Sequence, residues 1–263
     1  MQVRWSRRRV VVASLVALLL AAGVSGPLAS SLAQADEGRD DRIVLPSGRA
    51  YVLHTPPLLR SHPQLAEGRP AMIVLHPVDN EPADIERATG FNRLADRDGD
   101  LVAYPEGVRK AFNAGLCCGD PSLFEVDDVA FLSDVVADLK ARGASRVVAS
   151  GFSNGGMMAY RLACERPDLV DTIAVVSATL EIPHCDGPIT ALHLHGELDS
   201  TLPVAGLRYS KRLRCFLRDI RTIQGAAPGS AITIRILPGM GHRWTDARDT
   251  VDATADFWAF ARM

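Results

Sequence analysis

Three residues of the sequence could together perform acyl transfer: Ser153, Asp199 and His242. A serine hydroxyl is a poor nucleophile until a neutral imidazole removes its proton, and a carboxylate orients and stabilises the imidazolium that forms. Ser153 lies in Gly151-Phe152-Ser153-Asn154-Gly155, a G-x-S-x-G pattern. Glycines two residues on either side of the serine let a strand and a helix approach closely at a sharp turn. We therefore predict that Ser153 is a nucleophile presented on such a turn, with Asp199 as acid and His242 as base.

The elements around these residues fit this chemistry. The apolar run 147–150 is typical of a strand, and residues 157–163 have the pattern of a helix. Asp199 follows a predicted strand at 190–195, and His242 follows another at 232–237. Because catalytic groups of a doubly wound sheet collect at the carboxyl ends of its strands, the three residues should meet at one edge. The order serine, acid, histidine is that of an α/β-hydrolase.

The acid and the base each have rivals. Glu197 could replace Asp199, but it is two residues closer to the strand. The other histidines are His54, His62, His76, His184, His193 and His195. His193 and His195 fall within or at the end of a predicted strand, so hydrogen bonding within the fold is the simpler role for them.

The remaining chain alternates between strand and helix signals. We predict a hairpin at 43–53, strands at 71–75, 101–104 and 172–176, and helices at 85–97, 127–142, 206–220 and 249–262. Asp127 is the expected N-cap of the second helix, and the stretches 56–70 and 105–125 are expected to be loops. This alternation predicts a single α/β domain with a doubly wound, mostly parallel sheet.

Acyl transfer also needs two backbone donors for the developing oxyanion. One should be the N–H of Asn154, directly after the nucleophile. The other should come from the loop after the 71–75 strand, which reads His76-Pro77-Val78. Proline has no N–H, so Val78 is the expected donor.

The first 35 residues predict a signal peptide, which leaves residues 36–263 as the catalytic domain. Arg4 and Arg7-Arg8-Arg9 precede an apolar run at 10–24, and Ala33-Gln34-Ala35 offers a cleavage site. The alternative is a retained membrane anchor, but this run is shorter than the roughly 20 residues that a spanning helix needs. We expect a secreted protein, periplasmic or extracellular, with no stable membrane anchor after cleavage; the general and the twin-arginine export routes both stay open.

Charge and cysteine usage narrow the range of partners. Removing residues 1–35 takes away four of the 29 basic residues and none of the 31 acidic ones, so the formal charge moves from −2 to −6. We therefore expect no binding to nucleic acid or to an anionic membrane surface. The five cysteines suit an oxidising compartment, and we predict that Cys164 pairs with Cys185 and Cys215 with Cys117 or Cys118. Their spacing matches no zinc site, and we expect neither a metal nor an organic cofactor.

Several motifs resemble one family across nearly all of the mature chain. They are FNRLADR at 91–97, YPEG at 104–107, NAGLCCG at 113–119, VDDVAFL at 126–132, SNGGMMAY at 153–160, HGELD at 195–199 and GHRW at 241–244. These motifs resemble those of secreted α/β-hydrolase esterases of the poly(3-hydroxybutyrate) depolymerase-like and feruloyl-esterase-like type. The resemblance implies Ser153, Asp199 and His242 as nucleophile, acid and base. Relatives usually carry glycines where this chain has Pro77-Val78-Asp79, which stiffens the loop.

The expected function is therefore that of a secreted serine esterase that forms an acyl-enzyme. Its substrate, a small molecule or a polymer end, would be a hydroxybutyrate ester or a feruloyl or acetyl ester of plant polysaccharide. Phe152 and Trp244 are candidates either for an acyl pocket or for packing in the core. Asn113 and Asp120 belong to a loop that either shapes the pocket entrance near the ester or is surface held by a disulfide. The alternatives are a secreted serine peptidase on the same fold, or a binding protein whose altered 76–80 loop has impaired catalysis. Nothing in the sequence specifies an oligomeric state.

Overall fold

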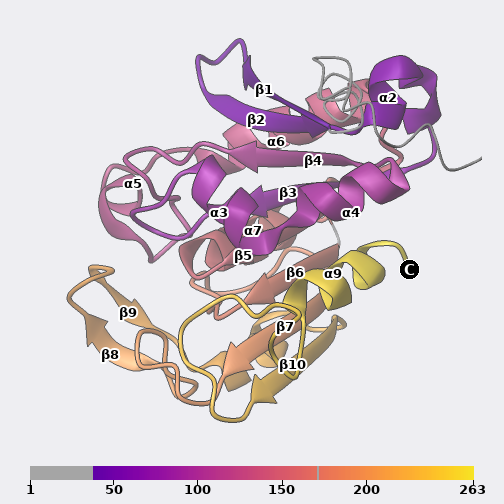
Figure 1. Ribbon diagram of the computed structural model, residues 1–263. Coiled ribbons are helices and arrows are strands. Elements are labelled where there is room, and N and C mark those ends of the chain that lie inside the picture. The colour runs from indigo at the N-terminus through magenta and orange to yellow at the C-terminus, as the bar shows by residue number, and fades with distance from the viewer. Residues whose placement is uncertain (1–37, 171) are drawn as a thin grey trace, which may run out of the picture. The chain divides into compact units, whose positions relative to one another are not determined.

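A mostly parallel sheet of eight strands forms the centre of the protein (Figure 1). The computed structural model describes residues 38–170 and 172–263. The strand order is β1-β2-β4-β3-β5-β6-β7-β10; β1 and β4 pair antiparallel with β2, and all the other pairs are parallel. The strands are β1 (Arg39–Val44), β2 (Ala50–Thr55), β3 (Pro70–Leu75), β4 (Leu101–Pro105), β5 (Arg146–Phe152), β6 (Thr172–Val176), β7 (Thr190–Gly196) and β10 (Ala231–Leu237). The predicted fold class is confirmed.

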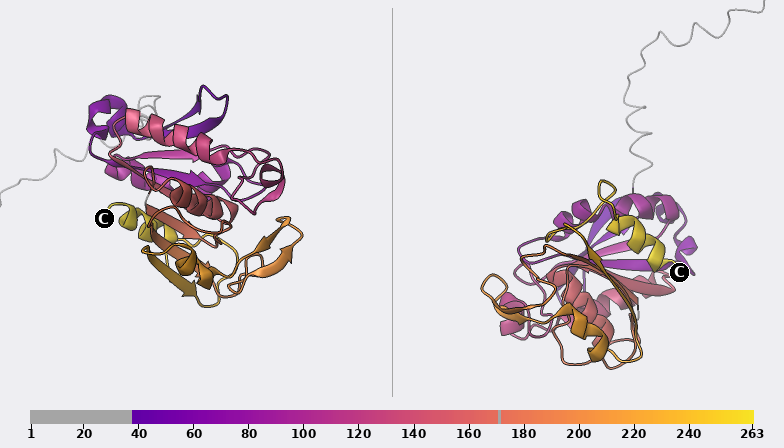
Figure 2. Two further views of the ribbon diagram at one scale, coloured as in Figure 1. Left: turned by 180° about the vertical axis from the view of Figure 1, so that it is seen from behind. Right: turned by 90° about the horizontal axis from the view of Figure 1, so that it is seen from below.

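Helices cover both faces of this sheet. The α-helices of eight or more residues are α3 (Pro82–Thr89), α4 (Phe91–Asp98), α6 (Asp128–Ala141), α7 (Asn154–Glu165) and α9 (Ala253–Ala261). Figure 1 and the view from behind in Figure 2 place α3, α4 and α9 on one face and α6 and α7 on the other. The shorter helices are α2 (Pro57–Ser61), η1 (Pro63–Ala66), α5 (Gly119–Leu123), η2 (Ile220–Thr222) and α8 (Ile223–Ala226).

Two apolar clusters, one on each face, hold the layers together. One contains buried residues of α6 and α7, and the other contains Phe91 of α4 and Phe257 of α9. All five residues of β4 and all five of β6 are buried. The short, continuously apolar runs in the sequence are therefore strands covered on both faces, as in other parallel sheets.

The helix predicted at 85–97 is wrong in one respect, because it is two helices. Gly90 ends α3 and precedes α4 with φ of 61°, a left-handed conformation that breaks the helical hydrogen-bond pattern. Asp127 does cap α6, since its side chain accepts a hydrogen bond from Ala130 N. The stretches expected as loops at 56–70 and 105–125 contain α2, η1 and α5.

The helix predicted at 206–220 is wrong throughout. In its place β8 (Leu207–Ser210) pairs antiparallel with β9 (Cys215–Leu217) in a separate two-stranded sheet. Arg214 has φ of 60° in the turn before β9, and along β9 Cys215 and Leu217 are buried while Phe216 is exposed. This alternation has the period of a strand, but at three residues it is too short to outweigh helix-favouring leucines and arginines in a sequence reading.

The predicted signal peptide lies outside the described residues. Across 38–170 and 172–263, none of the helices is both long and apolar enough to cross a membrane.

Candidate active site

Ser153 lies in a strained turn between β5 and α7. Its φ is 56° and its ψ is −121°, which is an unfavourable conformation for a residue with a side chain. An added Cβ at Gly155 would lie 2.0 Å from Leu75 O, and one at Gly151 would lie 2.4 Å from the carbonyl carbon of Gly155. Both glycines are therefore required by close backbone approach, as the G-x-S-x-G pattern predicts.

Ser153, His242 and Asp199 form one hydrogen-bonded chain. His242 Nε2 lies 3.1 Å from Ser153 Oγ, and His242 Nδ1 lies 2.7 Å from Asp199 Oδ2. A carboxylate can only accept, so Nδ1 carries the proton and Nε2 is the acceptor for the serine hydroxyl. The structure thus brings together the three residues that the sequence selects, in the geometry of a nucleophile, a base and an orienting acid.

Asp199 is held as a carboxylate within its own loop. Its Oδ1 accepts hydrogen bonds from the backbone N–H groups of Thr201 at 2.9 Å and Leu202 at 2.8 Å. Burial alone would raise the pKa of Asp199, but the hydrogen bonds from His242 and Leu202 outweigh burial and lower this pKa. Glu197, the rival acid, is exposed and instead accepts a hydrogen bond from Gly239 N.

A chain of buried rings connects α7 to the loop of Asp199. His195 Nε2 lies 2.7 Å from the Leu202 carbonyl, which can only accept, so His195 Nδ1 must accept from His193 Nε2 at 3.1 Å. His193 Nδ1 then accepts from Tyr160 OH, also at 3.1 Å. Burial lowers the pKa of both histidines, which favours these neutral tautomers. As predicted, His193 and His195 hydrogen-bond within the fold.

Of the remaining histidines, His62 and His184 are exposed. His54 lies between Asp40 and Asp96, at 2.7 and 2.9 Å. It therefore stabilises the edge of the sheet and is remote in sequence and contacts from Ser153.

The two expected oxyanion donors lie in segments that pack against each other at the start of α7. Asn154 is the first residue of α7, where a helix leaves its N–H groups without intrahelical acceptors. Val78 lies in the loop after β3, and in the described part of the chain no hydrogen bond engages its amide. Because an alanine Cβ at Gly155 would also come within 2.8 Å of His76 O, this loop packs directly on the start of α7.

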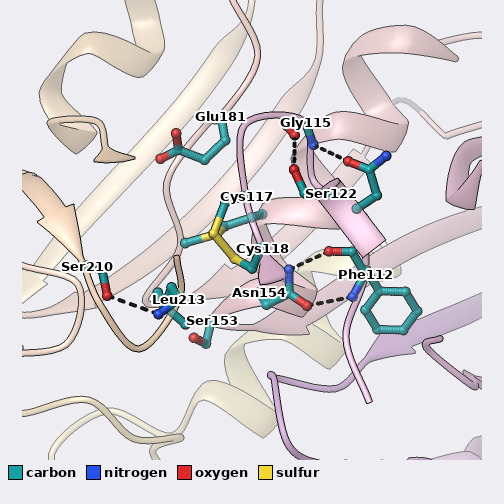
Figure 3. The surroundings of a disulfide bond; sticks show 12 residues. Phe112, Gly115, Cys117, Cys118, Ser122, Ser153, Asn154, Glu181, Ser210 and Leu213 are labelled. Carbon is teal, nitrogen blue, oxygen red and sulfur yellow. Dashed lines mark hydrogen bonds between the residues drawn. A yellow bond between two sulfur atoms is a disulfide. The ribbon is translucent and has the colours of Figure 1, made fainter. Parts of the chain in front are cut away.

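Two side chains that the sequence reading missed hold this region. The Asn154 side chain clamps Phe112, since Oδ1 accepts from Phe112 N at 2.8 Å and Nδ2 donates to Phe112 O at 2.9 Å (Figure 3). His76 donates from Nδ1 to Pro77 O and accepts at Nε2 from Gly107 N. Burial lowers the pKa of His76 and favours this neutral form. The only feature of the sequence that could have indicated this clamp is the asparagine directly after the nucleophile.

The two aromatic pocket candidates have different surroundings in the structure. Phe152 lies against His242 with ring centroids 4.7 Å apart and is partly exposed, so it can form a wall beside the base. Of the two roles open to Trp244, the structure supports packing: Trp244 is 8% exposed, packs edge-on against Phe257 and donates from Nε1 to Thr254. Trp244 is only two residues from His242 in sequence, but between them the chain turns into the core under α9.

Asn113 and Asp120 support the loop that follows β4. Asn113 N donates to Asp128 Oδ2 at 2.7 Å, and its side chain donates to Val126 O at 2.9 Å. Asn113 also lines a cavity of about 880 Å³, but Ser153, Asp199 and His242 are not among the residues that line it. Asp120 accepts from both Arg109 and Arg214.

The disulfide pattern is partly as predicted. Cys164 pairs with Cys185, whereas the pairing predicted for Cys215 is wrong, because Cys117 pairs with Cys118 and Cys215 is a buried free thiol. The three sulfur atoms of Cys117, Cys118 and Cys215 lie within 4.8 Å of one another, and Figure 3 shows the disulfide of neighbouring cysteines next to Asn154. With two of its sulfurs bonded to each other, this cluster does not offer three thiolates to a metal.

The strand order and the helices on both faces of the sheet are those of the α/β-hydrolase fold. Solved structures with this fold include the acetyl xylan esterase from Aspergillus awamori, with a TM-score of 0.59 and 13% identity over 85% of this chain and 100% of that one. Another is esterase PE8, with a TM-score of 0.54 and 19% identity over 85% of this chain and 99% of that one. At these identities the likeness concerns the fold alone.

Several sequence relatives are named as esterases. NocK of Nocardia uniformis subsp. tsuyamanensis, which is named as an esterase, is 39% identical over 187 residues, 66% of this chain and 52% of NocK. Feruloyl esterase B of Piromyces equi is 26% identical over 52% of this chain and 27% of its own length. Feruloyl esterase C of Emericella nidulans is 42% identical over 30% of this chain and 32% of its own length. No protein-family model matches the chain.

These sequence relatives are named as esterases, and the chain resembles feruloyl esterases among them. It spans about half the length of NocK and less than a third of the two feruloyl esterases.

Proposed function

We propose that the protein is a secreted serine esterase that hydrolyses carboxylic esters through an acyl-enzyme on Ser153. The observation that carries this proposal is the chain from Ser153 Oγ to His242 Nε2 at 3.1 Å and from His242 Nδ1 to Asp199 at 2.7 Å. The strained turn at Ser153 supports it, because an unfavourable φ at a residue with a side chain is kept where function requires it.

The proposed reaction has two halves. His242 Nε2 removes the proton of Ser153 as Oγ attacks the ester carbonyl, and the amides of Asn154 and Val78 stabilise the negative oxygen that forms. The alcohol leaves with the proton from His242, which gives an acyl-enzyme. Water then attacks this acyl group with His242 again as base, and the acid is released.

The substrates that we propose are feruloyl or acetyl esters of plant polysaccharide, or hydroxybutyrate esters. The names of the relatives favour the first group, since two of them are feruloyl esterases. The resemblance of the motifs to those of poly(3-hydroxybutyrate) depolymerase-like proteins supports the second group, so hydroxybutyrate esters are included in the substrate panel.

Export of the protein is also part of the proposal. The basic residues, apolar run and A-x-A site within residues 1–35 support it. N-terminal sequencing of protein recovered from the culture medium or the periplasm should find a chain that starts at Asp36, whereas an uncleaved chain held in the membrane would favour an anchor.

Hydrolysis of an ester panel tests the proposed activity. The purified protein should hydrolyse p-nitrophenyl esters, methyl ferulate, acetylated xylo-oligosaccharides or hydroxybutyrate oligomers, and Ser153→Ala should lower kcat/KM by at least ~10³-fold. Ser47→Ala, at an exposed turn between β1 and β2, is the matched control. Hydrolysis retained by Ser153→Ala would refute the assignment, and cleavage of peptide amides in preference to esters would indicate a peptidase.

A further inference from the structure

A cleft beside the expected oxyanion donor is lined by an excess of cationic side chains. The cleft has a volume of about 200 Å³, and we call it the basic cleft. Four chain segments contribute to it: the loop after β3, the turn after β4, the start of α5 and the turn between β8 and β9. Its lining includes Val78, Asp79, Arg109, Lys110, Ala111, Gly119, Asp120, Pro121, Arg212, Leu213 and Arg214.

The basic cleft adjoins the candidate active site through two of its own lining residues. Val78 is the expected oxyanion donor, and it lines the cleft directly. Ala111 precedes Phe112, whose backbone N–H and C=O are both held by the Asn154 side chain. The two segments are also joined to each other, since Asp79 N donates to Lys110 O at 2.9 Å. A group bound in the cleft would therefore lie next to the expected oxyanion donor and next to the segment that the Asn154 side chain holds.

The charges of the cleft do not cancel. Four of its lining side chains are cationic and only two, Asp79 and Asp120, are acidic. A single carboxylate, that of Asp120, serves both Arg109 and Arg214, at 2.6 and 2.7 Å. The whole chain carries a formal charge of −2, so a local excess of positive charge runs against its average composition.

Arg212 is the least committed of these cations. Within residues 38–170 and 172–263 its one ion pair is to Asp79 at 3.9 Å, the outer limit for such a contact, and its side chain is 66% exposed. By contrast, Lys110 pairs with Glu81 at 2.7 Å. The guanidinium of Arg212 can therefore turn towards an incoming anion without breaking a close pair, and its planar donors suit a carboxylate.

We propose that the basic cleft binds a second, free carboxylate group of the ester substrate, so that the enzyme prefers anionic esters to neutral esters of equal length. This inference rests on the proposed esterase activity and adds the charge of the substrate to it. The carboxylate could belong to the acyl part or to the alcohol part of the ester, and the experiment below separates these two sources.

Matched ester pairs test the preference. Monomethyl adipate and methyl hexanoate place a carboxylate or a methyl group at the same position of the acyl part, and 4-acetoxybutanoate and butyl acetate do the same for the alcohol part. The anionic member of at least one pair should have the higher kcat/KM, by about two- to fivefold for each cation engaged, the range for exposed ion pairs. This preference should disappear in 1 M salt, where the Debye length falls to about 3 Å.

Two variants should move the preference in opposite directions. Arg212→Gln should lower the ratio of anionic to neutral kcat/KM, and Asp79→Asn should raise it, because each removes one charge of the cleft. Asp79 has φ of 64°, a conformation that asparagine tolerates well, so the second variant should fold normally. Arg208→Gln, at an exposed arginine of β8 outside the cleft lining, is the control and should leave the ratio as it is.

Equal kcat/KM values within both pairs, or a preference that Arg212→Gln and Asp79→Asn do not alter, would overturn this inference. If the neutral esters are still hydrolysed and Ser153→Ala abolishes that hydrolysis, the esterase proposal stands although the cleft proposal fails. If the protein hydrolyses neither neutral nor anionic esters, the esterase proposal itself is refuted.

Discussion

Replacing Gly155 with alanine should damage both the stability and the activity of the protein. The added Cβ would lie 2.0 Å from Leu75 O and 2.8 Å from His76 O. Ordinary contacts of this kind are about 3.5 Å, so α7 and the end of β3 would have to separate by roughly 1.5 Å. Neither partner is a flexible side chain, and overpacking against backbone is among the most destabilising of single substitutions.

We expect Gly155→Ala to lower the free energy of unfolding by about 3 kcal/mol or more. For a domain of this size that corresponds to a fall in Tm of roughly 6–12 °C. The loop that must move leads directly to Val78, so kcat/KM should fall by about 10²-fold as well, the usual consequence of a displacement of about 1 Å at a reacting centre.

Gly225→Ala is the matched control. Gly225 lies in α8, and apart from its chain neighbours and the backbone of its own helix no heavy atom lies within 4 Å of the Cβ that alanine would add. Alanine there should leave Tm unchanged or raise it slightly, because glycine is the poorer helix former. Thermal unfolding followed by circular dichroism, together with p-nitrophenyl acetate hydrolysis, measures both effects. A Gly155→Ala protein with the Tm and kcat/KM of the parent would refute the close-approach argument.

Three further predictions concern single groups of the structure. Asp199→Asn should lower kcat by about 10⁴-fold while the protein stays folded, because His242 loses the acceptor that fixes its tautomer; steady-state kinetics checks this. Because burial lowers the pKa of His193 and His195, the unfolded chain takes up protons first as the pH falls below about 6.5, and the free energy of unfolding should drop by up to about 1.4 kcal/mol per pH unit for each ring. Urea titrations at pH 7, 6 and 5 would contradict this if the free energy were constant. Burial raises the pKa of the Cys215 thiol to about 12, so iodoacetamide at pH 8 should label it only after denaturation, and rapid labelling of the native protein would contradict its burial.

The central sheet and the arrangement around Ser153 could be predicted from the sequence because their signals are local. The buried strands are short apolar runs, and the G-x-S-x-G pattern is typical of one geometry, a sharp turn between a strand and a helix. Asp199 and His242 could be predicted because each lies in the loop that follows a strand, and the carboxyl ends of parallel strands share one edge. The sequence thus contains the positions, while the 3.1 and 2.7 Å contacts required the structure.

The errors of the sequence reading, and the alternatives that it left open, concern contacts with distant partners. The β8–β9 hairpin has the composition of a helix, and only pairing between its two strands distinguishes it. Trp244 is buried because it packs against Phe91, which is far away in sequence, and against Phe257 of α9. The three cysteines 117, 118 and 215 do meet, as expected, but which two of three neighbouring sulfurs bond cannot be derived from spacing.

The most direct test of the account is a fluorophosphonate reaction followed by intact-mass and peptide-mass analysis. A serine activated by a hydrogen-bonded imidazole reacts with this probe, whereas ordinary serines do not. We predict one adduct per chain, located on Ser153 and absent from Ser153→Ala. A folded protein that forms no adduct, or forms it at another residue, would contradict the assignment of Ser153 as the nucleophile.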